Sequence, residues 1–178
     1  AGAKVSYTVG RESNKQYDET YNGVQLRDKH QFTDGIDPYI VKGKPESGLL
    51  SGISNARLDA PGTGDKKVQA YNFRICLSDD PQNMIPITKP EGYDSSRYEL
   101  LVRLMEKEPT RPFNLILKPD IMPGRKTDIN NNGPISTDMI GMNYSYPEAS
   151  FADRQKITKE HEQYVKGLLY FIGHSSRL

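Results

Sequence analysis

The stretch Lys67-Val-Gln-Ala-Tyr-Asn-Phe-Arg-Ile-Cys-Leu77 decides how the rest of the chain is interpreted. Its odd positions are apolar from residue 71 onward, while its even positions form a second face, as in a β-strand with one buried side. The apolar positions are Tyr71, Phe73, Ile75 and Leu77. The pattern predicts a strand over 67–77 that buries this face and turns Asn72 and Arg74 toward a cleft on the opposite side.

A helical pattern follows this strand. Asp94 or Ser95 is a suitable N-cap for a helix that runs to about Lys107, where Pro109 prevents its continuation. The apolar stripe of this helix consists of Tyr98, Leu101, Val102 and Met105.

The last part of the chain carries a second, longer helical pattern. Ser150, with Asp153 three residues later, resembles a capping box with Asp in place of Glu. The predicted buried side consists of Ile157, His161, Tyr164, Val165, Leu168, Leu169 and Ile172. His161 could be a half-buried structural histidine or a catalytic one, and the sequence is compatible with both roles.

The remaining segments indicate loops and short strands. Residues 4–9 and 113–117 have strand character, whereas glycine and proline interrupt 10–66, 78–92 and 119–149. We therefore predict an α+β fold in a single domain over 1–178, with a mixed or antiparallel β-sheet, two main helices and long irregular loops.

Composition excludes several classes of function. Lys and Arg number 24 against 23 Asp and Glu, so the chain lacks the basic excess of a nucleic-acid-binding protein. No apolar run approaches the roughly 18 residues of a membrane span. A single cysteine, Cys76, excludes an internal disulfide and a multi-cysteine metal site.

Asn72 and Arg74 are the first candidate site residues. The guanidinium of arginine forms a planar fork for oxyanions, and an asparagine amide offers both donors and an acceptor. Together they could orient a carboxylate or a polyol. The alternative is a solvated strand face on which Arg74 pairs with an acid such as Asp79.

The sequence Asp128-Ile-Asn-Asn-Asn-Gly133 matches the first half of a calcium-binding loop. The twelfth position, which needs a bidentate Glu, is Met139, so we expect no metal site here. Two interpretations of this segment remain, a polar turn and a loop that presents amides to a polar ligand.

The chain resembles the middle of a family of FAD-dependent oxidoreductases of the two-dinucleotide-binding-domain flavoprotein type, whose members often carry a xanthan lyase label. The resemblance rests on phrases spread along the chain, at residues 5–12, 34–39, 68–77, 89–94, 126–133, 143–147 and 167–171. It implies a substrate-binding or cap domain of a larger flavoprotein. No motif dedicated to cutting polysaccharide accompanies the lyase label.

The flavin fingerprint G-x-G-x-x-G does not occur in the sequence. The resemblance therefore implies FAD in the full-length parent and none bound to this chain. The expected partners are the remainder of the flavoprotein chain and a small polar, possibly carbohydrate-related substrate, with no nucleic acid. The expected substrate contacts are Asn72, Arg74, Lys126, Asp128, Asn130 and Asn132, the last four from a loop over 126–132. A non-enzymatic carbohydrate-binding or interaction module is the alternative function.

Overall fold

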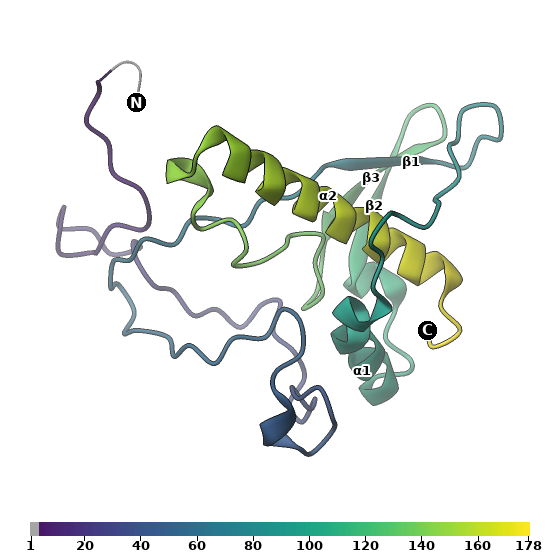
Figure 1. Ribbon diagram of the computed structural model, residues 1–178, viewed down its shortest axis with the longest axis horizontal. Coiled ribbons are helices and arrows are strands. Elements are labelled where there is room, and N and C mark those ends of the chain that lie inside the picture. Colours follow the sequence, from purple (N-terminus) through teal and green to yellow (C-terminus); the bar gives the residue numbers. More distant parts are fainter. Residues whose placement is uncertain (1–3) are drawn as a thin grey trace.

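The computed structural model describes residues 4–178. Within that range the main regular elements are β1 (Ile75–Ser78), α1 (Glu99–Lys107), β2 (Leu117–Met122), β3 (Lys126–Asn131) and α2 (Phe151–His174). Short 3-10 helices accompany them at Pro45–Ser47 (η1), Ser95–Tyr98 (η2), Phe113–Leu115 (η3) and Tyr146–Glu148 (η4). One antiparallel sheet, two α-helices and long loops make up this part of the chain (Figure 1), which confirms the predicted α+β class.

The sheet is antiparallel, in the order β1-β3-β2. Its central strand β3 was expected to be part of a loop, and residues 113–117 were expected to be a strand. Instead η3 occupies most of 113–117, and β2 and β3 form a hairpin whose turn contains Gly124 and Arg125, both at positive φ. The alternating pattern of residues 126–131 is compatible with a strand as well as with a metal-binding loop. The segment forms a strand because it pairs with β1 on one side and with β2 on the other.

The strand predicted over 67–77 is correct only at its C-terminal end, where β1 pairs with β3 from Ile75 to Ser78. Tyr71 and Phe73 lie outside it and are 41% and 39% exposed, so the prediction that they are buried is wrong. Ile75 is partly buried against the core, as expected. Pairing with β3 stops at Ile75, opposite Ile129, so the residues before Ile75 belong to no strand.

Both predicted helices are confirmed. Asp94 accepts a hydrogen bond from the backbone of Ser96 at the start of η2, which leads directly into α1. Ser150 accepts from the backbone of Asp153 at the start of α2. These caps satisfy amide groups that a helix leaves free at its first turn.

The hydrophobic core lies where α1, α2 and the sheet meet. Its most completely buried side chains are Leu101 and Leu104 of α1, Ile116 before β2, and Leu168 of α2. Ile75 and Ile129 pair across the sheet on the face that contacts this core, so directly opposed residues share one side as expected of antiparallel pairing.

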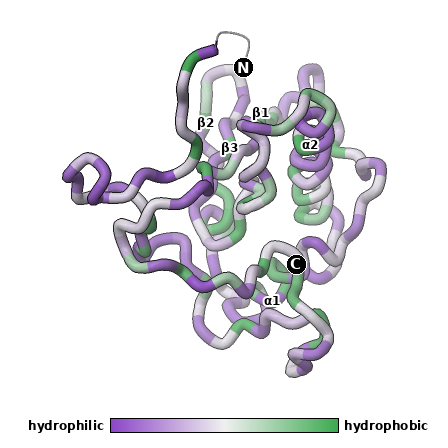
Figure 2. The backbone as a smooth tube through the Cα atoms, turned by 60° about the vertical axis from the view of Figure 1, so that its left-hand side comes forward, coloured by the Kyte–Doolittle hydropathy of each residue, from purple (hydrophilic) through white to green (hydrophobic). Residues whose placement is uncertain are grey.

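Residues 4–66 contribute loops and little regular structure, and the chain there is largely hydrophilic (Figure 2). The strand expected over 4–9 does not form, because this segment is mostly exposed and pairs with no other strand. Isolated bridges join Arg11 to Asp65 and Tyr39 to Leu49. No helix in residues 4–178 combines the length and apolarity needed to cross a membrane.

Candidate functional site

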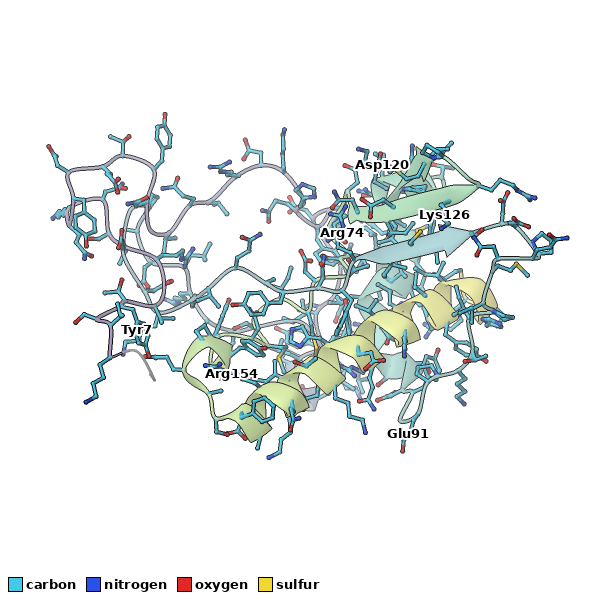
Figure 3. The ribbon with its side chains drawn as sticks, turned by 90° about the horizontal axis from the view of Figure 1, so that it is seen from above. Tyr7, Arg74, Glu91, Asp120, Lys126 and Arg154 are labelled. Carbon is cyan, nitrogen blue, oxygen red and sulfur yellow. The ribbon has the colours of Figure 1, made fainter. Side chains whose placement is uncertain are left out.

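Four of the six residues expected from the sequence gather at the outer face of the sheet. Lys126, Asp128 and Asn130 alternate along β3, and the side chain of Asp128 accepts an ion-pair hydrogen bond from Arg74. Figure 3 labels Arg74 and Lys126 at the sheet, across from α2. The outer face is therefore polar and solvated.

The partner of Arg74 differs from the acid suggested by the sequence. Asp79 accepts instead from Arg125, at 2.9 Å between Oδ1 and Nε. Arg74 pairs with Asp128 because of the strand register, in which Asp128 lies opposite Cys76, two residues from Arg74. The Arg74 guanidinium is thus already neutralised by a carboxylate.

The expected loop over 126–132 is a strand through Asn131, so its backbone groups serve the sheet and are not free to cradle a ligand. Asn132, the first residue beyond the strand, donates its side-chain amide to the carbonyl oxygen of Asn114 at 2.8 Å. Among residues 4–178 no three His, Cys, Asp or Glu side chains converge as a metal site would require.

Asn72 lies apart from Arg74 and contacts a different segment. Its side-chain amide donates to Asp138 Oδ1 at 2.5 Å and to Thr137 Oγ1 at 3.4 Å. Nearby, Asn143 donates to the carbonyl oxygen of Gln69 at 2.7 Å. Side-chain contacts with residues 137–143 therefore hold the segment 69–72, for which the sequence predicted strand pairing.

Through Asp138, Asn72 is connected to a cavity of about 250 Å³, which we call the Arg97 cavity. Residues of η2, α1, α2, the segment 134–142 and the N-terminal loops at Phe32 and Ser51 form its walls. The lining is mostly apolar, with a few polar groups, as in many small-molecule sites. Its polar and aromatic groups include Arg97, Tyr98, Ser136, Asp138 and Tyr164.

Arg97 is the positive charge of this cavity. Its guanidinium lies 5.6 Å from the centre of the Tyr164 ring, and Nη2 is 3.8 Å from the sulfur of Met139. No carboxylate of the described residues lies within ion-pair distance of it. A half-buried guanidinium with this environment can bind an oxyanion of a ligand through its two parallel N–H groups.

The phenols beside Arg97 have a structural role. Tyr164 donates to the carbonyl oxygen of Ser136 at 2.8 Å, and Tyr98 donates to that of Tyr164 at 2.9 Å. Burial raises the pKa of Tyr164 to about 12 and raises the pKa of Tyr98 further. Both phenols stay protonated at neutral pH, so they shape the cavity and are unsuited to act as bases.

Sequence reasoning missed Arg97 and Asp138. Tyr98 and Tyr164 were assigned to apolar stripes, and the position of Arg97 beside Tyr98 is the only local signal that it lies near the core. Whether Arg97 has a carboxylate partner depends on which acidic residues the fold brings near it. The local sequence does not contain this information.

Comparison with known proteins agrees with the resemblance noted in the sequence. The chain matches the family described as "FAD dependent oxidoreductase" over residues 1–177. No curated protein and no solved structure matches the chain significantly. Since the match covers almost every residue, the chain belongs to the FAD-dependent oxidoreductase family.

Proposed function

We propose that this chain is the substrate-side part of an FAD-dependent oxidoreductase and that the Arg97 cavity holds the substrate. The observation that carries the proposal is the half-buried Arg97 guanidinium in this cavity, which has no carboxylate of the described residues within ion-pair distance. Asp138 lies in the same cavity, so a small ligand with an oxyanion and a hydroxyl group would find a partner for each. The reaction class is transfer of a hydride between this substrate and the flavin.

The described residues do not fit the pyrophosphate of FAD. A dinucleotide site places phosphate at an uncapped helix N-terminus after a parallel strand. Here the sheet is antiparallel, Glu99 lies in the first turn of α1, and Asp153 lies in that of α2. These carboxylates would repel phosphate. We therefore assign FAD to the remainder of the flavoprotein chain.

Titration of the 178-residue chain with FAD tests this assignment. We expect no saturable change in flavin fluorescence at micromolar FAD, because the phosphate-binding elements are not among these residues. The full flavoprotein should be purified with its flavin bound. A stoichiometric yellow complex of the 178-residue chain would overturn the assignment.

The competing location for the substrate is the sheet's outer face. The contacts expected from the sequence were Asn72, Arg74, Lys126, Asp128, Asn130 and Asn132. An anion bound to Arg74 would have to compete with Asp128. Among residues 4–178 no carboxylate lies within ion-pair distance of the Arg97 guanidinium. We therefore place the substrate at Arg97, with Asn72 acting indirectly by holding Asp138.

Two arginine variants of the flavin-loaded protein separate these locations. Bleaching of the flavin absorbance would be followed with a panel of small hydroxy acids and polyols. Arg97→Ala should raise KM for the active hydroxy acid about 10- to 100-fold, the loss expected for a charge-assisted hydrogen bond. Arg97→Lys should recover part of this, because charge is kept and the fork is lost.

Arg74→Ala is the matched variant, since it removes the same side chain from the outer face. It should leave KM unchanged. The opposite pattern, with KM raised by Arg74→Ala and unaffected by Arg97→Ala, would move the site to the sheet. Flavin content and melting temperature, measured on each variant, distinguish lost binding from lost folding.

A further inference from the structure

A second cavity, which we call the His161 cavity, lies beside the N-terminal half of α2 and has a volume of about 330 Å³. It shares no lining residue with the Arg97 cavity. Its walls come from the segment 71–73, from Tyr146 of η4 and from one side of α2. The α2 side consists of Ile157, Thr158 and His161.

His161 is only 4% exposed, and its two ring nitrogens are in different situations. Nδ1 lies 2.7 Å from the carbonyl oxygen of Ile157. A carbonyl oxygen can only accept, so Nδ1 carries the proton of the neutral ring and Nε2 carries a lone pair. Nε2 is buried and has no hydrogen-bond partner among the described residues. A buried acceptor without a donor is unfavourable unless a ligand or water supplies one.

Asn72 and Thr158 add further acceptors to the cavity, while the phenols of Tyr71 and Tyr146 can donate or accept. The Asn72 amide nitrogen is already used by Asp138, which leaves its carbonyl oxygen available. The Thr158 hydroxyl donates to the carbonyl oxygen of Arg154 at 2.8 Å. None of the lining residues is Asp, Glu, Lys or Arg. The complementary ligand is therefore neutral and brings a hydrogen-bond donor for Nε2 of His161.

Aromatic rings supply the rest of the wall. Tyr71 meets Tyr146 edge to face, with ring centres 5.5 Å apart and planes at 86°. Phe73 lines the same cavity. Such rings pack against the C–H face of a sugar or against another aromatic ring. The wall 71–73 lies outside the sheet and its residues are partly exposed, so this side of the cavity borders solvent.

We propose that the His161 cavity binds a neutral ring that carries a hydroxyl group. The hydroxyl donates to Nε2 of His161, and the ring packs against Tyr71, Phe73 and Tyr146. A sugar and a phenol share this chemistry, and the two are distinguished by experiment. The proposal is independent of FAD and of the Arg97 cavity.

Nitrogen-15 NMR of the histidine side chains tests the proposal directly. The 178-residue chain would be titrated with methyl glucoside and, separately, with phenol. A hydrogen bond to Nε2 moves its resonance away from that of a bare acceptor, so a saturable shift at His161 is expected with one of the two probes. The responding probe identifies the ligand as a saccharide or a phenol. No shift with either probe up to its solubility limit would overturn the proposal.

Variants then assign the effect to the acceptor. His161→Phe keeps a ring of similar shape without the lone pair and should weaken binding of the responding probe at least about tenfold. His161→Gln replaces the acceptor with an amide oxygen and should bind more tightly than His161→Phe. Unchanged affinity in His161→Phe would contradict the proposal. If that variant does not fold, the comparison of His161→Gln with the parent chain decides.

His174 offers a matched control on the same helix. Its Nδ1 also contacts a carbonyl oxygen four residues earlier, that of Tyr170 at 3.0 Å, but its ring is exposed and lies outside the cavity. His174→Phe should leave the affinity and the His161 shift unchanged. An equal loss of affinity in His174→Phe would show that the cavity is not the binding site.

Discussion

Arg103 is a buried charge that fastens the N-terminal loops to α1. Its side chain is 5% exposed, and it donates to the carbonyl oxygens of Asp37 at 2.8 Å, Tyr39 at 2.6 Å and Ile40 at 3.2 Å. The carboxylate of Glu99 lies 3.2 Å from its Nε. Removal of the guanidinium would leave the carbonyl oxygens of Asp37, Tyr39 and Ile40 without this donor.

Replacement of this side chain should therefore be costly. Arg103→Met keeps the length of the side chain and removes its donors, and we expect a loss of about 3–5 kcal/mol in the free energy of unfolding, the range for breaking a buried charge pair. Urea unfolding measures it. Arg125→Met removes an exposed ion pair and should cost less than about 1 kcal/mol. Equal effects of the two would show that Arg103 is not an anchor.

The expected contribution of Phe73 to stability is smaller in the structure than the sequence predicted. A core position would give Phe73→Ala a loss of about 3–5 kcal/mol. At 39% exposure Phe73 removes far less surface from water, so we expect a loss below about 2 kcal/mol. Leu168→Ala, at 0% exposure, should cost about 2–5 kcal/mol in the same thermal or urea measurement. A larger effect for Phe73 would restore the buried-strand interpretation.

At the scale of elements, the packing of α2 on η2 depends on Gly167. This glycine lies inside α2, and a Cβ there would overlap the hydroxyl of Tyr98. That hydroxyl donates to the carbonyl oxygen of Tyr164. The absence of a side chain at Gly167 therefore allows the tyrosine to lie against the helix.

Gly167→Ala tests this close approach. Alanine favours a helix over glycine by about 1 kcal/mol, yet here we expect destabilisation by about 1–3 kcal/mol because the methyl group forces the helix away from Tyr98. Adding Tyr98→Phe should make the double variant more stable than the sum of the single changes predicts. Gly173→Ala, where a Cβ would meet nothing within 4 Å, should be neutral or stabilising. Additive effects would exclude the steric explanation.

At the scale of the whole molecule, the C-terminal residues are tied to α1. Arg177 donates to both carboxylate oxygens of Glu99, at 2.6 and 3.2 Å. These bonds, followed by those from Arg103, hold the pKa of Glu99 below its ordinary value of 4.5. A lowered pKa in the folded state stabilises the protein above the pKa of the unfolded chain. This contribution disappears as the pH falls through the folded pKa.

Melting temperatures from neutral pH to about pH 3 measure the contribution. Glu99→Gln should lower stability at neutral pH and flatten the decline in the acid range, because the amide does not titrate. Arg177→Met should flatten the same part of the curve, less completely, since Arg103 still contacts Glu99. An acid-range decline of unchanged steepness in Glu99→Gln would assign the acid sensitivity to other carboxylates.

The two helices could be predicted from sequence because their hydrogen bonds and caps are local. Asp94 and Ser150 cap amides two or three residues away, and the buried stripes follow from a 3.6-residue period. A strand requires a partner distant in the chain, and for this reason the strand at 67–77 was predicted too long and β3 was not predicted at all.

By itself, then, the sequence determined the α+β class, the positions and buried sides of α1 and α2, and the resemblance to FAD-dependent oxidoreductases. Only the tertiary structure decided which arginine forms an ion pair with a carboxylate. Asp128 neutralises Arg74 because register brings β3 beside the end of β1, whereas no carboxylate of the described chain lies within ion-pair distance of Arg97. The physical reason is distance, since an ion pair depends on positions in space that residues far apart in the sequence reach only through folding.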